Sequence, residues 1–300
     1  MEFVLIVLPA FIIFAVGYVG QKTIGFDIKS ISVMTTYLMY PFLVFRTFYT
    51  NKITLDYFYI LIFCLLLCFI LMVIVKIVSK LKKLPQSIES AMMLSAVFMN
   101  SGNYGAPIIL FVFGQTAFDY AVIMMVIQSF LMNTIGLYYA AIGSKEGSSI
   151  KSALMKIVKM PVLYGSAAGI LLQILHVPVP DFIMQPVGLI ADATIPTIMV
   201  ILGMQLANIQ LKSVKAGDVA SIFIIRMIIS PIISIGIILC LPLEDLLAKI
   251  LIILASMPTA ANTTMFAVQF QTEPDLVSFS TLTTTLASIA TVPLLLALLS

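Results

Sequence analysis

Two polar stretches interrupt otherwise apolar segments of the chain, and their residue types suit the binding of a small ion. The first, NSGNYGAP, covers residues 100–107, and the second, PTAANTT, covers residues 258–264. Both combine amide or hydroxyl side chains with helix-weakening residues, because proline donates no backbone hydrogen bond and glycine leaves the backbone free. The candidate binding residues are Asn100, Ser101, Gly102, Asn103, Gly105, Pro107, Pro258, Asn262, Thr263 and Thr264.

Three interpretations of these stretches are open. An interrupted helix exposes a new N-terminus, whose free N–H groups and dipole favour an anion such as a carboxylate. The side-chain oxygens could instead coordinate sodium, with a site near Asn103, Asn262 and Thr263. The third interpretation is structural, since glycine and proline also permit close packing and kinks in membrane helices. Because two such stretches occur at corresponding positions, we favour binding.

The composition of the chain places these stretches in a membrane. Hydrophobic residues make up 61% of the 300 residues, charged residues only 10%, and the mean hydropathy is +1.16. Soluble chains carry about 25% charged residues, whereas apolar segments of roughly 20 residues, the length that crosses a bilayer, recur here. The pattern predicts an all-α polytopic membrane protein with ten spans. These lie near residues 2–20, 31–50, 57–79, 88–113, 118–142, 152–175, 182–206, 217–240, 245–270 and 275–299.

The basic residues predict the orientation of the spans. Twelve of the 16 Lys and Arg residues fall on one side of the predicted membrane and three on the other, while Arg226 lies within a span. Because the side rich in Lys and Arg is cytoplasmic, we expect a multi-pass protein of the cell membrane with both termini extracytoplasmic. The same count assigns the basic residues to short loops and gives no indication of nucleic-acid binding.

The two halves of the chain resemble each other in sequence. PAFIIFAVG at residues 9–17 matches PVLYGSAAG at residues 161–169, Pro41 matches Pro196, and Gln115-Thr116 matches Gln271-Thr272. A repeat of five spans must re-enter the membrane from the opposite face, which is the inverted topology of many secondary transporters. We therefore predict a first five-helix repeat at residues 1–142, a short cytoplasmic linker at 143–151 and an inverted second repeat at 152–300. The polar stretches then occupy the fourth and ninth spans, which we expect to be broken.

Two charged residues are predicted to lie near the middle of the membrane. Asp192 falls about ten residues into the seventh span and Arg226 about ten residues into the eighth. A lone charge at this depth costs at least about 2.5 kcal/mol, so each needs a partner or a cavity. They could attract substrate and carry a coupling ion, but their matched depth favours a mutual salt bridge that ties the two helices together. Arg46 is expected to extend to the outer surface.

The motifs resemble those of the auxin efflux carrier family. NSGNYGAP is similar to the family's fourth-span signature, and four further stretches match in the family's order: YPFLVFRTFYTN at 40–51, DATIPTIMVILG at 192–203, RMIISP at 226–231 and MPTAANTTMFA at 257–267. The resemblance implies ten helices in two inverted repeats with broken helices 4 and 9 crossing, as in the bile-acid/sodium symporters. It also implies a homodimer through scaffold spans 1, 2, 6 and 7, elevator-type transport and small carboxylate substrates. The short linker is typical of bacterial members.

The sequence therefore predicts a secondary transporter of small organic anions, with no cofactor and with H⁺ or Na⁺ as the possible coupling ion. Sodium-coupled symport of the bile-acid type is the alternative within transport. A non-transporting membrane sensor is a more distant alternative, because the loops are too short for a signalling domain. An enzyme is not expected, since the chain has a single histidine and lacks the HExxH and GxSxG motifs.

Overall fold

The computed structural model of the chain describes residues 2–144, 160–208 and 214–299, and the regular structure in these ranges is helical. Most of the predicted linker 143–151 and the predicted start of the sixth span, 152–159, lie outside the described residues. Six of the described helices are long and apolar enough to cross a membrane, and shorter apolar helices cover 8–24, 101–113 and 161–174. The expectation of a polytopic all-helical membrane protein is confirmed.

The helices begin and end within a few residues of the predicted spans. The helices of the first half are α1 (Glu2–Ile24), α2 (Ile28–Met34), η1 (Thr35–Met39), α3 (Tyr40–Thr50), α4 (Leu55–Lys82), α5 (Gln86–Val97), η2 (Ser101–Gly105), α6 (Ala106–Phe113), α7 (Gln115–Leu131), η3 (Met132–Gly136) and α8 (Leu137–Ile142). Those of the second half are α10 (Pro161–Ile174), α11 (Asp181–Ala207), α12 (Ala216–Ile224), η4 (Ile225–Ile229), α13 (Ser230–Ile238), α14 (Asp245–Ala255), α15 (Ala261–Phe270) and α16 (Pro274–Leu299).

The segments labelled η are single turns of π-helix, and three of the four end two residues before a proline. These prolines are Pro41, Pro107 and Pro231. Proline has no N–H to donate to the carbonyl four residues earlier, so the hydrogen-bond ladder widens by one residue before it. Such π-turns are frequent at functional sites. Here one of them, η2, coincides with the first polar stretch.

Helices from the two halves of the chain pack together in two close pairs, α1 with α11 and α3 with α10. Glycine permits the contact in both pairs. A methyl group at Gly17 would overlap the carbonyl oxygen of Val200, and one at Gly169 would lie 2.7 Å from the carbonyl oxygen of Phe45. Without a side chain on one partner the backbones approach closely, and dispersion contacts then hold helices that the hydrophobic effect cannot drive together in lipid.

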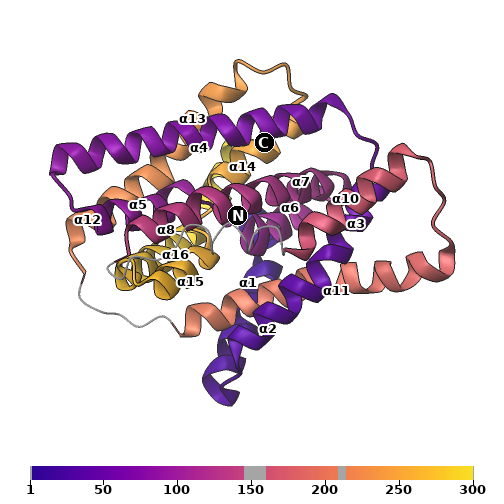
Figure 1. Cartoon of the computed structure of the whole chain (residues 1–300), viewed down its shortest axis with the longest axis horizontal. Coiled ribbons are helices and arrows are strands. Elements are labelled where there is room, and N and C mark those ends of the chain that lie inside the picture. The colour runs from indigo at the N-terminus through magenta and orange to yellow at the C-terminus, as the bar shows by residue number, and fades with distance from the viewer. Residues whose placement is uncertain (1, 145–159, 209–213, 300) are drawn as a thin grey trace.

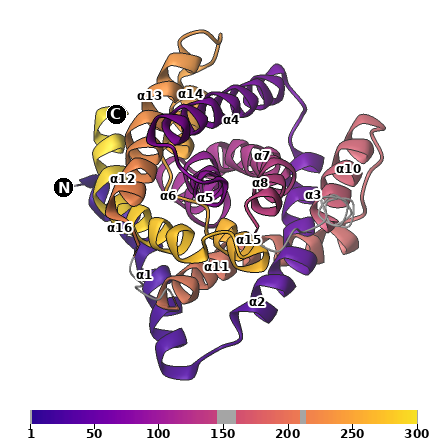
Figure 2. The ribbon, with the colours of Figure 1, turned by 60° about the vertical axis from the view of Figure 1, so that its left-hand side comes forward.

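The helices from α4 to α8 and from α12 to α16 form a second group around the two polar stretches, whereas α2 and η1 pack on α11 of the first group. In both views α4 and α13 lie on the opposite side of the molecule from α2 and α11, with α5, α6, α7 and α8 between them (Figure 1, Figure 2). The segments from α5 to α6 and from α14 to α15 carry the largest share of fully buried residues (for example Leu94, Ile108 and Leu251). The polar stretches therefore lie in the best-shielded part of the protein.

Replacing Gly17 by alanine tests the glycine contact. The added methyl group must push α1 away from α11, and such overpacking typically costs about 1–3 kcal/mol. We expect a lower unfolding temperature for Gly17→Ala in detergent. The chain has no tryptophan, so unfolding is best followed with a thiol-reactive dye that labels Cys64 and Cys68, both buried in the folded protein, in a Cys240→Ala background that removes the exposed thiol.

Gly236→Ala is the matched control, because nothing lies within 4 Å of a methyl group at that position in α13. It should leave the unfolding temperature unchanged or raise it, since alanine is favoured over glycine inside helices by about 0.5–1 kcal/mol. Equal effects of the two substitutions would contradict the packing role of Gly17.

Candidate functional site

The two polar stretches cross and bond to each other in an antiparallel arrangement. The backbone N–H of Asn100 donates to the carbonyl of Pro258 at 2.8 Å, and the N–H of Ala260 donates to the carbonyl of Phe98 at 3.0 Å. The two bonds flank a bridge between Met99 and Thr259. We call residues 98–100 together with 256–260 the crossing point. It interrupts the path from α5 to α6 and the path from α14 to α15, as predicted for the fourth and ninth spans.

In a membrane interior, each backbone N–H or C=O group without a hydrogen-bond partner costs several kcal/mol. The crossing point supplies such partners. Each extended segment uses the other as its hydrogen-bond partner. Side chains satisfy further groups, since Thr259 donates its hydroxyl to the carbonyl of Ser95 at 2.7 Å and its N–H bonds to the hydroxyl of Thr284 at 3.2 Å. The break in each helix is therefore stable only in the presence of the other.

Arg226 satisfies the helix ends on one side of the crossing point. Its Nη1 donates to the carbonyls of Ala96 and Val97, at 3.1 and 3.2 Å, in the last turn of α5. Its Nη2 donates to the carbonyl of Ala255, the last residue of α14, and to the hydroxyl of Ser230, which also donates to Ala255 at 2.8 Å. Terminal carbonyls of a helix have no partner within the helix and carry a partial negative charge. The fully buried guanidinium neutralises two such ends at once.

The expected salt bridge between Asp192 and Arg226 is wrong. Asp192 pairs instead with Arg46, whose Nη1 lies 2.6 Å from the Asp192 Oδ1 and also contacts the carbonyl of Gly188 at 3.3 Å. Matched depth along the membrane normal does not determine which helices are neighbours. α11 packs on α1 and α3, whereas the helix that carries Arg226 packs on α4, α5, α14 and α16. Arg46, expected to extend outward, has a side chain only 23% exposed.

A helix N-terminus follows each segment of the crossing point. η2 begins at Ser101 and α15 at Ala261, each directly after the crossing residues. The first N–H groups of a helix lack intrahelical partners and carry a partial positive charge. Since Arg226 already binds the carbonyl ends of α5 and α14, the two N-termini are the helix ends whose partial charge suits an anion.

Predicted binding residues of the fourth span lie in η2 and directly before it. Asn100, Ser101 and Asn103 are 4%, 3% and 8% exposed, so the site is closed to solvent in this conformation. The Asn100 amide nitrogen is buried and has no hydrogen-bond partner among the described residues. Asn103 accepts a hydrogen bond from the Tyr40 hydroxyl at 2.8 Å. A methyl group at Gly102 would lie 3.1 Å from Met125, and one at Gly105 would lie 2.6 Å from Leu254, so both glycines keep the neighbouring helices close.

Predicted binding residues of the ninth span are more often committed to structural hydrogen bonds. Thr263 is buried and donates to the carbonyl of Ala260 at 2.7 Å, and the hydroxyls of Thr264 and Thr281 lie 3.3 Å apart. Asn262 is partly buried in the first turn of α15. Pro258 contributes its carbonyl to the crossing bond, and Pro107 lies in the first turn of α6. Nothing in these contacts decides between a carboxylate and sodium.

Sequence reasoning missed two residues at this site. Tyr40 reaches Asn103 from a helix 63 positions earlier in the chain, and its only signal was its place before Pro41 in a motif. Thr259 was passed over although it lies inside the second polar stretch. Its hydroxyl anchors the ninth-span segment to α5. Both contacts depend on which helices lie side by side.

Comparisons with known proteins agree with this architecture of a membrane carrier. A family model described as a membrane transport protein matches residues 3–296, and the chain belongs to this family, that of the auxin efflux carriers. The chain is 23% identical over 291 residues to an uncharacterized transporter of Methanothermobacter thermautotrophicus, covering 96% of this chain and 93% of that protein. It is 28% identical over 217 residues to the uncharacterized transporter MJ1031 of Methanocaldococcus jannaschii, covering 71% and 69%. These names indicate a transporter, a class of protein that is not usually enzymatic.

Removing the Arg226 guanidinium should destabilise the crossing point. Arg226→Met removes the guanidinium donor from the buried carbonyls of Ala96 and Val97 and one of the two donors of Ala255, which keeps the Ser230 hydroxyl. Each orphaned group costs about 1–3 kcal/mol. We expect a large fall in unfolding temperature or loss of folded protein for Arg226→Met, and partial recovery for Arg226→Lys, which keeps a charged donor. The measurement is dye-monitored unfolding together with monodispersity on size-exclusion chromatography.

Arg46→Gln serves as the control, because its partner Asp192 has a side chain that is 71% exposed and exposed ion pairs contribute about 0–1 kcal/mol. If Arg226→Met were no more damaging than Arg46→Gln, Arg226 would not hold the crossing point together.

Proposed function

We propose that the protein is a secondary transporter of small organic anions, and that the substrate carboxylate binds at the helix N-terminus that follows Asn100. The observation that carries this proposal is the Asn100 amide nitrogen, which is buried directly before the first residue of η2 and has no partner among the described residues. A buried donor with no acceptor lowers stability. A carboxylate oxygen would supply the missing acceptor, and the adjacent N–H groups would stabilise its charge.

Two sets of contacts support a fold of ten spans in inverted repeats, with repeats at 1–142 and 152–300. If an internal two-fold axis relates the two halves, Asn100 corresponds to Ala260 and Phe98 corresponds to Pro258. The hydrogen bond from Asn100 to Pro258 then corresponds to the one from Ala260 to Phe98. The close contact of Gly17 with Val200 corresponds in the same way to the close contact of Gly169 with Phe45. Gly17 and Gly169 are paired by the sequence match, and Val200 lies four residues after Pro196 as Phe45 lies four after Pro41.

An elevator-type mechanism accounts for the closed site. The helices α1, α3, α10 and α11 of the proposed scaffold pack on one another, while the crossing point belongs to the other group of helices. Because Asn100, Ser101 and Asn103 are at most 8% exposed, substrate can enter only after the two groups move relative to each other. The Tyr40–Asn103 hydrogen bond joins the two groups and would break or shift in that movement. We propose a homodimer through the scaffold and both termini outside the cell.

The coupling ion is H⁺ or Na⁺. A sodium site near Asn103, Asn262 and Thr263 would use amide and hydroxyl oxygens, of which Asn103 Oδ1 and Thr263 Oγ1 already take part in hydrogen bonds but retain free lone pairs. Proton coupling would use a carboxylate, and Asp192, paired with Arg46, is the candidate inside the proposed spans.

Asn100→Ala separates a transport role from a structural one. Among the described residues the Asn100 side chain has no hydrogen-bond partner that this substitution would remove, and its buried amide nitrogen is unsatisfied there. We therefore expect the unfolding temperature to stay the same or rise, while uptake of carboxylates such as malonate or malate into proteoliposomes falls at least about 100-fold, as for loss of a charge-assisted hydrogen bond and its orientation.

Asn208→Ala is the control, because Asn208 is exposed at the end of α11; it should leave both transport and stability unchanged. Undiminished uptake by folded Asn100→Ala protein would refute the proposed binding site.

A thermal-shift screen tests the coupling ion. A ligand that binds only the folded protein raises its unfolding temperature, so carboxylates should stabilise the wild-type protein and not Asn100→Ala. If sodium is the coupling ion, the shift produced by carboxylate should increase in NaCl over equimolar choline chloride. An equal shift in the two salts would favour H⁺, and stabilisation by amines or sugars alone would contradict an anion carrier.

A further inference from the structure

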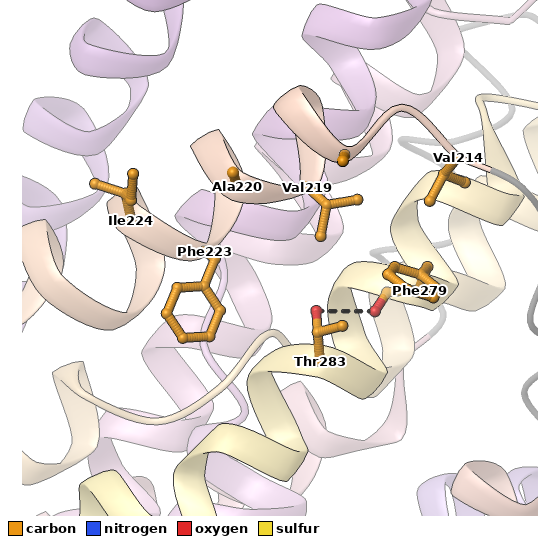
Figure 3. A pocket seen from close by; sticks show the side chains of 8 residues that line it. Val214, Val219, Ala220, Phe223, Ile224, Phe279 and Thr283 are labelled. Atoms are coloured by element: carbon orange, nitrogen blue, oxygen red, sulfur yellow. Dashed lines mark hydrogen bonds between the residues drawn. The ribbon is translucent and has the colours of Figure 1, made fainter.

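An apolar groove lies between α12 and α16, away from the crossing point. Its volume is about 570 Å³, and it is lined by Val214, Ala216, Val219, Ala220, Phe223, Ile224, Phe279 and Thr283 (Figure 3). The Thr283 hydroxyl donates to the carbonyls of Phe279 and Ser280 in its own helix, at 3.0 and 3.1 Å. The hydroxyl is thereby satisfied, so the groove offers an occupant almost nothing but hydrocarbon and methyl groups.

Basic residues lie at one end of this groove. Lys215 is exposed between the lining residues Val214 and Ala216. Lys82, at the last turn of α4, donates its ammonium group to the carbonyl of Gly217 at 3.0 Å and also contacts the hydroxyl of Ser221. Both positive charges therefore lie beside the first turn of α12. Asp218, the carboxylate of that turn, is buried at 6% exposure, so the lysines present the accessible charge.

The groove and the lysines together have the chemistry of a phospholipid site. An apolar channel open along its length suits a flexible acyl chain, and a pair of ammonium groups at its mouth suits a phosphate. Both lysines belong to the side of the chain that is rich in basic residues, where the leaflet carries anionic lipid and each nearby Lys contributes attraction. A polar solute would lose its hydration in this groove without gaining hydrogen bonds.

We propose that this groove binds one anionic phospholipid, with an acyl chain between α12 and α16 and the headgroup phosphate on Lys215 and Lys82. The site touches η4 through α12, because α12 continues directly into the turn that carries Arg226. An acyl chain in the groove would therefore support the helix that holds the crossing point. This inference does not depend on the identity of the transported anion.

The test uses detergent-purified full-length protein and two phospholipids with identical acyl chains, phosphatidylglycerol and phosphatidylcholine. Lipid retained on the protein is counted by native mass spectrometry, and unfolding is followed with the thiol-reactive dye. We expect one tightly held phosphatidylglycerol and a larger rise in unfolding temperature with phosphatidylglycerol than with phosphatidylcholine. Lys215→Gln should weaken the retained binding about five-fold, as expected for one lysine near an anionic surface.

Ala220→Phe places an aromatic ring in the groove and should abolish the retained lipid while leaving the lysines in place. Matched controls are Lys29→Gln, an exposed lysine on the same predicted side, and Ala168→Phe, an exposed alanine on α10 far from the groove. The controls should bind phosphatidylglycerol as the wild type does. Equal stabilisation by the two lipids, or unchanged binding in both Lys215→Gln and Ala220→Phe protein, would overturn the proposal.

Discussion

The structure depends on satisfying peptide groups where no water can reach them. Two helices are broken at the same place, and every group freed by the breaks must find a partner inside the protein. The extended segments supply part of the solution by bonding to each other, and Arg226 supplies the rest by binding the carbonyl ends of α5 and α14. A buried guanidinium would be costly alone. Here the cost of its desolvation is offset by hydrogen bonds to two helix C-termini, whose partial negative charge is opposite to the charge of the guanidinium.

The helix ends at the crossing point differ in whether a protein group already binds them. The carbonyl ends of α5 and α14 are bound by Arg226, whereas the amide of Asn100, directly before η2, has no partner among the described residues. A protein built only for stability would remove such a group. Its retention next to a helix N-terminus is the reason to regard the start of η2 as the place for an exchangeable anion and the carbonyl ends as scaffolding.

The two groups of helices solve different packing problems. In the group formed by α1, α3, α10 and α11, backbones approach through glycine, and the Arg46–Asp192 ion pair joins α3 to α11. Around the crossing point the polar hydrogen bonds are numerous and pass between segments far apart in the chain, such as Thr259 to Ser95 and Ser288 to Tyr104. Relative movement of these groups would leave the internal contacts of each intact, because few bonds, among them Tyr40 to Asn103, join one to the other.

The sequence by itself determined the membrane class, the helix boundaries and the location of both breaks, because hydrocarbon thickness sets the span length and proline, glycine and asparagine act on the backbone where they stand. It also selected Asn100, Ser101, Asn103 and Thr263, which are buried, but not Thr259. Only the tertiary structure decided the partners of the polar side chains. Arg226 caps two helix ends, Asp192 pairs with Arg46, and Tyr40 donates a hydrogen bond to Asn103. A side chain's depth along the membrane follows from its place in a span, but its neighbours follow from the packing of helices around it, which no local pattern of residues specifies.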